Sequence, residues 1–170
     1  MTLARLQGTA LCDSDRTLVA ENGAVTGWVK TSPFIYCVAI GNDGEDVDAG
    51  VFRLQWEIEG GTNANLGSTG AIKYTSSTVL TDNAALQVAG SRVTSAAGLG
   101  MTWQNGEEIE DGVSASVNLA SDCYTELQFG VDVSEAIDGA TYIFRLYNVN
   151  ETSALGIDAG SYVTVKIAGK

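Results

Sequence analysis

The sequence contains no histidine, and this absence removes several classes of active site. Imidazole is the general base of Ser-His-Asp and Cys-His systems and the commonest side-chain ligand of catalytic metals. The chain also has no G-x-x-x-x-G-K-[ST] segment, and Gly98-Leu99-Gly100 does not continue into a dinucleotide-binding fingerprint. We therefore expect a protein that is not an enzyme and that needs no cofactor.

Basic residues are scarce, with 9 Lys and Arg against 21 Asp and Glu and a net charge of −12. Such a surface repels nucleic-acid phosphates and anionic lipids, because both bind proteins mainly through Lys and Arg. No apolar run approaches the roughly 20 residues that a membrane span requires, and the first residues lack the apolar core of a signal peptide. We expect no nucleic-acid partner, no membrane partner and no cleaved export signal.

Cysteine and proline are also rare. Cys12, Cys37 and Cys123 are widely spaced and form no C-x-x-C pair, which argues against a disulfide framework or a zinc site. The single proline, Pro33, stands beside 20 glycines, and this ratio is typical of many tight turns between short strands.

Period-two alternation of apolar and polar residues is the main structural signal, and it predicts half-buried strands. Half-buried alternation favours antiparallel sheets, so we expect an all-β, antiparallel two-sheet β-sandwich, immunoglobulin-like or jelly-roll-like. Residues 1–50 are expected to form an N-terminal arm or additional strands of the same domain, and residues 51–170 the sandwich domain. The clearest strands are Phe52–Ile58, Leu127–Val133, Tyr142–Leu146 and Val163–Ile167, and weaker ones are Leu3–Leu11, Thr17–Ala20, Gly27–Lys30, Ile72–Thr75 and Val113–Val117.

Two acidic clusters, at residues 43–48 and 107–111, lie next to glycines. Paired carboxylates are the machinery of glycosidases, but adjacent acids in glycine-rich loops are more often a solvated surface, and we interpret both clusters in that way. The first cluster is also a candidate calcium site, although its spacing departs from the EF-hand pattern. Its candidate ligands are Asp43, Glu45, Asp46 and Asp48.

Residues 34–40 are apolar at every position, so both faces of the predicted strand need a cover. One alternative is that Leu3–Leu11 or a loop of the same chain covers it. The other is a subunit interface in a homo-oligomer, with a trimer as the candidate arrangement. The second alternative makes Phe34, Tyr36 and Val38 interface candidates.

Tryptophan residues extend the list of candidate binding residues. Trp56 lies on an alternating apolar face and is predicted to be in the core. Trp28 and Trp103 lie near glycines and are candidates for exposure. Exposed indoles anchor protein interfaces or stack on sugar rings, so both residues are candidates for either role.

Several segments, taken in order, resemble β-sandwich modules of tailed-phage virion proteins, including capsid decoration and head-fibre proteins. The resemblance extends roughly from Val51 to Ile167 and implies a virion component without catalytic residues. The segments that carry it are Val51–Glu57, Thr81–Ala85, Asp122–Phe129 and Asp138–Leu146.

The resemblance implies a decoration protein, a head fibre or a tail-associated module. The chain's modest length favours decoration over a fibre, and the scarcity of basic residues suits the capsid exterior rather than contact with the genome. The expected partner is the major capsid protein or another virion protein, with assembly in the host cytoplasm. The alternative is a carbohydrate-binding adhesion module.

Overall fold

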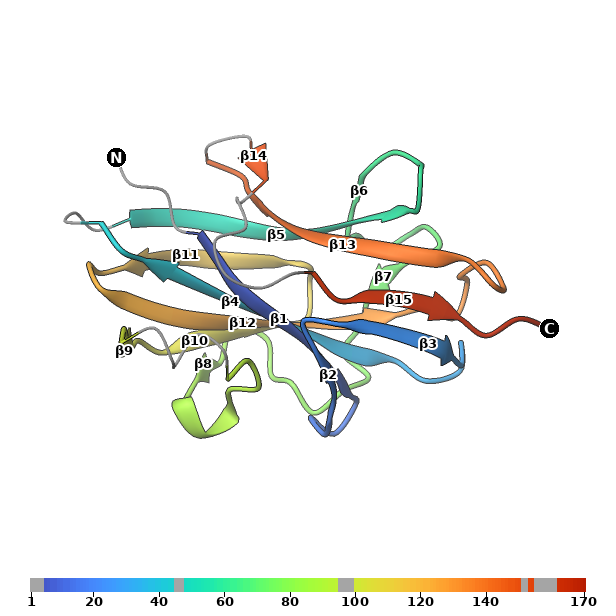
Figure 1. The fold of residues 1–170 in the computed structure, drawn as a ribbon, viewed down its shortest axis with the longest axis horizontal. Coiled ribbons are helices and arrows are strands. Elements are labelled where there is room, and N and C mark those ends of the chain that lie inside the picture. Colours follow the sequence, from blue (N-terminus) through green and yellow to red (C-terminus); the bar gives the residue numbers. More distant parts are fainter. Residues whose placement is uncertain (1–4, 45–47, 95–99, 151–152, 155–161) are drawn as a thin grey trace.

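The computed structural model describes residues 5–44, 48–94, 100–150, 153–154 and 162–170. Two β-sheets lie face to face and enclose the main core (Figure 1), which confirms the expected all-β two-sheet sandwich. The helical structure in these ranges is a single 3-10 turn at Val88–Gly90. No helix of the described residues has the length and apolar character needed to cross a membrane.

Sheet A is built around two long central strands that are buried along almost their whole length. These are β4 and β12, which pair antiparallel from Phe34 opposite Val131 to Asn42 opposite Cys123. The strand order is β2 (Leu18–Glu21), β1 (Arg5–Asp13), β4 (Phe34–Asn42), β12 (Cys123–Asp132), β10 (Gly106–Ile109) and β8 (Ala85–Leu86), with β7 (Lys73–Tyr74) and β9 (Thr102–Trp103) also pairing with β12.

Sheet B contains the strands in which alternation is clearest. In β13 every second side chain is buried, as the alternation of Tyr142, Phe144 and Leu146 predicts. The strand order is β11 (Val113–Leu119), β5 (Asp48–Ile58), β13 (Thr141–Asn148), β15 (Thr164–Ile167) and β3 (Ala24–Trp28), with β14 (Ser153–Ala154) pairing with β13 and β6 (Ala64–Asn65) with β5.

The sheets are mixed rather than wholly antiparallel, and here the sequence-based expectation was wrong. Strands β9 and β10 run parallel to β12, and β3 runs parallel to β15. The parallel partners are not joined by hairpins: most of the chain separates β3 from β15, and β11 of the other sheet lies between β10 and β12 in the sequence. Strands joined in this way can pair in parallel. Gly106 permits the close approach of β10, because an added Cβ there would overlap the backbone carbonyl oxygen of Glu126.

The main core lies between the sheets and is rich in aromatic residues. Phe144 of sheet B packs against Tyr36 of sheet A with ring centroids 4.7 Å apart and meets the ring of Phe34 at 5.9 Å. The hydroxyl of the fully buried Tyr36 donates a hydrogen bond of 2.7 Å to the carbonyl oxygen of Val163. The two sheets are therefore joined by ring packing and by a buried hydrogen bond.

Much of the first fifty residues belongs to this same core. Strands β1, β2 and β4 lie in sheet A, and β3 lies in sheet B. Leu6 and Leu11 of β1 are fully buried in the main core with residues from the rest of the chain. The described part of residues 1–50 thus supplies additional strands to the sandwich.

Candidate functional site

The outer face of sheet A is covered by residues 75–94, which we call the covering segment. Leu80 and Val93 of this segment pack against side chains of β1 and β4 in a second apolar cluster, which we call the outer cluster. Its buried members are Ala10, Cys12, Ile35, Cys37, Ala39, Leu80, Val93 and Tyr124.

This arrangement explains why β4 is apolar on both faces. Phe34, Tyr36 and Val38 point into the main core and are fully buried, whereas Ile35 and Cys37 point into the outer cluster. Residues of the same chain therefore cover both faces. The interpretation of Phe34, Tyr36 and Val38 as interface residues was wrong, because none of them reaches the surface of the folded chain.

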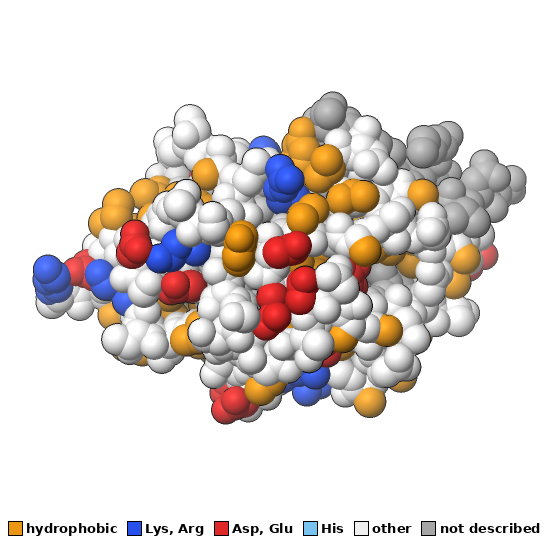
Figure 2. Space-filling model, turned by 180° about the vertical axis from the view of Figure 1, so that it is seen from behind, with side chains coloured by type: hydrophobic (Ala, Val, Ile, Leu, Met, Phe, Trp, Pro, Cys, Tyr) orange, Lys and Arg blue, Asp and Glu red, His pale blue; other side chains and the backbone are white. Residues whose placement is uncertain are grey.

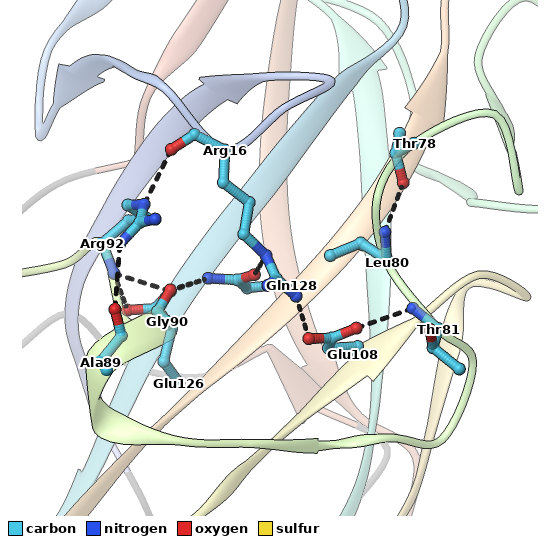
Figure 3. A network of polar contacts seen from close by, with 10 residues as sticks. All are labelled: Arg16, Thr78, Leu80, Thr81, Ala89, Gly90, Arg92, Glu108, Glu126 and Gln128. Atoms are coloured by element: carbon cyan, nitrogen blue, oxygen red, sulfur yellow. Dashed lines mark hydrogen bonds and ion pairs between the residues drawn. The ribbon is translucent and has the colours of Figure 1, made fainter.

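A buried carboxylate anchors the covering segment (Figure 3). Glu126 of β12 is fully buried and accepts hydrogen bonds from the Ser91 hydroxyl and from the backbone N–H groups of Arg92 and Val93, each at 2.9 Å to Oε2. Backbone donors stabilise a buried carboxylate in the absence of solvent. The carboxylate thus provides the hydrogen-bond acceptor that water would otherwise supply to Ser91, Arg92 and Val93.

The network continues from Glu126 to Arg16, in the turn between β1 and β2. The Gln128 amide donates to Glu126 at 2.7 Å and to the carbonyl oxygen of Gly90 at 2.9 Å. Arg16 donates through Nε to the Gln128 side-chain oxygen at 3.0 Å and through its terminal nitrogen to Glu108, with which it forms an ion pair. Glu108 in turn accepts from the backbone N–H of Thr81 at 2.7 Å.

These contacts correct two expectations. Half-burial of a strand with alternating residues would leave the polar side chains Glu126 and Gln128 outside the core, and Glu107 and Glu108 were expected in a solvated loop, yet all four side chains are buried. Most of their hydrogen-bond partners are residues distant in the sequence. Neither the alternation of residues nor the glycine content predicts such partners.

Glu107 faces the opposite side of β10 and has its own partner. Its carboxylate accepts from the backbone N–H of Ala115 at 2.9 and 3.1 Å. Burial raises the pKa of the Glu107 carboxyl, and the hydrogen bond from Ala115 opposes that rise. The carboxylates at residues 107 and 108 are thus fixed by structural contacts on different sides of the strand, and they do not form the facing pair that a glycosidase needs.

Most of the candidate calcium site lies outside the described residues. Asp43 is exposed. Glu45, Asp46 and the side chain of Asp48 lie outside the described residues. Among the residues that the structure does describe, no group of three or more acidic or cysteine side chains is placed to hold a metal ion.

All three tryptophans are half-buried, and Trp28 and Trp56 both pack against the main core. Trp56 packs against the main core and meets the ring of Tyr142 at 5.7 Å. Trp103 is half-buried, packs against Tyr124 at 5.3 Å and donates to the side chain of Asn105 at 3.2 Å. Trp28 is also half-buried and lines a cavity of about 250 Å³ at the end of β3.

Two cysteines lie beneath the covering segment. The Sγ atoms of Cys12 and Cys37 are 3.9 Å apart on neighbouring strands, and both side chains are fully buried. The hydrogen bond with Cys37 lowers the pKa of the Cys12 thiol, whereas burial raises that of Cys37 well above its usual range. Cys123 is half-buried. All three cysteines are free thiols.

The described residues on the back of the molecule form no broad apolar surface. Figure 2 shows hydrophobic side chains scattered among acidic and uncharged ones on this face. Scattered apolar residues are normal for a protein surface and do not mark an interface.

Comparisons of the chain with models of protein families, with curated proteins and with solved structures find no match.

Proposed function

We propose that the protein is a structural binding module, and specifically a decoration protein of a tailed phage that attaches to the outside of the capsid lattice and stabilises the particle. The observation that carries the proposal is the use of the carboxylates in the buried network. Glu108 and Glu126, with Arg16, hold the covering segment onto sheet A. The carboxylates of Glu108 and Glu126 are buried in structural contacts, whereas a hydrolase keeps its catalytic carboxylates accessible to substrate.

Sequence features give the proposal its particular form. The sequence of residues 51–167 resembles virion β-sandwich modules, and this resemblance is the reason for proposing a particle-bound role. The net charge of −12 suits an exterior position, where the protein does not meet packaged nucleic acid. The major capsid protein is the proposed partner.

Self-association on the particle remains a prediction of this proposal. A symmetric lattice presents repeated sites, and several weak contacts made together bind more tightly than one. The predicted oligomer must use a surface other than residues 34–40, because the chain itself covers them.

The test compares particles of the encoding phage with and without the gene. We expect the protein in purified wild-type particles, a lower disruption temperature for particles without it, and recovery of that temperature when purified protein is added. Absence of the protein from washed particles, or an unchanged disruption temperature without it, contradicts the proposal.

A carbohydrate-binding adhesion module is the second candidate, and the cavity beside Trp28 favours it. Indole rings beside a cavity are suited to stacking on sugar rings, and Asp13 and Ser32 line the same cavity. A glycan array separates the two candidates, since selective binding of one glycan class supports the adhesion module.

A further inference from the structure

The cavity beside Trp28 opens where the end of β1 meets the connection between β3 and β4. Its volume is about 250 Å³, and its lining includes Asp13, Trp28, Val29 and Ser32. Strands β2 and β3 lie next to each other here and end their respective sheets at this side of the sandwich (Figure 1). The cavity therefore lies at an edge of both sheets.

The aromatic wall of the cavity is held in place. The indole Nε1 of Trp28 donates a hydrogen bond of 2.8 Å to the carbonyl oxygen of Ser32. The ring also packs against Phe34 of the core at a centroid distance of 5.5 Å and an angle of 86°. A ring fixed at both points offers a binding surface that loses little conformational entropy when a ligand arrives.

Asp13 is a lining residue that carries a carboxylate. Its Oδ1 accepts from the backbone N–H groups of Asp15 and Thr17, both at 2.9 Å, which fixes the side chain in the turn. Within the described ranges, no Lys or Arg forms an ion pair with Asp13, although Arg16 lies three residues away and binds Glu108 instead. The carboxylate is thus oriented by its own turn, and no Lys or Arg among the described residues forms an ion pair with it.

Exposed apolar side chains adjoin the cavity. Val29 is 53% exposed and belongs to its lining. Val79 is 48% exposed, and its backbone N–H donates to the carbonyl oxygen of Ser14, another lining residue, at 3.1 Å. Apolar surface next to an oriented carboxylate is complementary to a cation on an aliphatic stem.

We propose that this cavity binds a lysine or arginine side chain of the partner protein. The stem lies along Trp28 and Val29, and the cation pairs with Asp13. Because the Trp28 N–H already donates to Ser32, a ligand in the cavity meets the face of the indole ring and receives no hydrogen bond from it. The net charge of −12 draws a basic segment toward the surface. The identity of the partner, a capsid protein, rests on the proposed function, whereas the cavity chemistry does not.

The direct test uses the full chain and the probe Nα-acetyl-lysine methylamide, followed through the NMR resonances of the indole N–H groups. We expect a saturable shift of the Trp28 resonance and none of the Trp103 resonance, which serves as the internal reference. The norleucine analogue of the probe, which has the stem without the cation, and methyl glucoside should both leave Trp28 unchanged.

The variant Asp13→Asn removes the charge and retains an oxygen acceptor for the turn. Its control is Asp15→Asn, which makes the same charge change at an exposed residue outside the cavity lining. Asp13→Asn should weaken probe binding roughly fivefold or more, and Asp15→Asn by less than about twofold. An unmoved Trp28 resonance, equal binding of the norleucine analogue, or equal effects of the two variants overturns the proposal. A shift with methyl glucoside alone overturns it in favour of a sugar site.

Particle binding separates this inference from the proposed function. Weaker binding of Asp13→Asn than of Asp15→Asn to particles that lack the protein supports both. Equal, strong particle binding of the two variants contradicts the cavity proposal and leaves the decoration role standing. Probe binding without any particle binding supports the cavity and contradicts the decoration role.

Discussion

The carboxylate Oε2 of Glu126 lies 2.9 Å from the backbone nitrogen of Val93, and this contact joins the covering segment to the centre of sheet A. The side chain of Val93 is buried in the outer cluster with Cys37 and Leu80. Val93 thus makes an apolar contact through its side chain and a buried hydrogen bond through its backbone. Loss of the Glu126 carboxylate should weaken both contacts.

Glu126→Gln tests the importance of this anchor. The amide retains one oxygen acceptor but presents an NH₂ group where the carboxylate accepts from backbone N–H groups, leaving buried donors unpaired. We expect a loss of about 2–3 kcal/mol in the free energy of unfolding, measured by urea denaturation. Amides 91–93 should also exchange with solvent faster than those of β13. Glu59→Gln, at an exposed glutamate, is the control. Equal stability of the two variants would show that the anchor is unimportant.

Arg16→Lys probes the other end of the network. The guanidinium reaches Gln128 and Glu108 at once through separate nitrogens, and a lysine ammonium does not reproduce that geometry. We expect a loss of about 1–3 kcal/mol on urea denaturation. Combined with Glu108→Gln, the loss should be smaller than the sum of the two single losses, because both variants break the same contact. Strict additivity argues against coupling between the two side chains.

Alternation predicted the strands well where one face meets solvent or half-buried side chains. In β13 the pattern alone identifies Tyr142, Phe144 and Leu146 as core residues, and all three are fully buried. The same reasoning failed for β12, where Glu126 and Gln128 are as deeply buried as Phe129. A period-two pattern separates two faces but does not say what lies against the polar one.

The candidate site was less predictable than the fold. The donors to Glu126 from the covering segment are 33–35 positions away in the sequence, and Glu108 binds Arg16 from 92 positions away. No local pattern records such pairings. The apolar character of both faces of β4 did predict a second cover, but not that residues 75–94 supply it. Short strands such as β8 and β9 carry too few residues for a periodicity to be visible.

Tyr36→Phe should change how stability depends on pH. Burial raises the pKa of Tyr36 well above its usual value, so the folded chain holds the phenolic proton more tightly than the unfolded chain. The free energy of unfolding should therefore decrease as pH rises above about 10, the usual tyrosine pKa, toward the folded-state pKa.

At neutral pH, Tyr36→Phe should lose about 1 kcal/mol, because the hydrogen bond to the carbonyl oxygen of Val163 disappears. Above pH 10 its stability should fall less steeply than that of the wild type, and the difference between the two should shrink. Urea denaturation from pH 7 to 11 measures both slopes. Parallel slopes contradict the assignment of the alkaline loss to Tyr36.

Thiol reactivity should report closure of the covering segment. Cys12 and Cys37 are fully buried beneath it, and Cys123 is half-buried. A chromogenic disulfide reagent should therefore react rapidly with at most one thiol of the folded protein and with all three in denaturant. In Glu126→Gln, Cys12 and Cys37 should react faster than in the wild type, while Cys123 does not change. Rapid reaction of all three thiols in the folded wild type contradicts burial by the segment.

Phe144→Ala and Phe129→Ala test the packing of the two sheets. Both phenylalanines are fully buried in the main core, and Phe144 also meets the rings of Phe34 and Tyr36 in the opposite sheet. Truncation removes the buried ring and leaves a cavity that a close-packed sandwich fills only in part. Each variant should lose about 3–5 kcal/mol of unfolding free energy.

Ile137→Ala is the matched control, because it also shortens a large apolar side chain, but one that is 55% exposed. It should change the free energy of unfolding by less than about 0.5 kcal/mol. Thermal melts and urea denaturation of the three variants measure the difference. A melting temperature of Phe144→Ala equal to that of Ile137→Ala would mean that β13 does not present Phe144 to the core, and that the register between β13 and β5 is wrong.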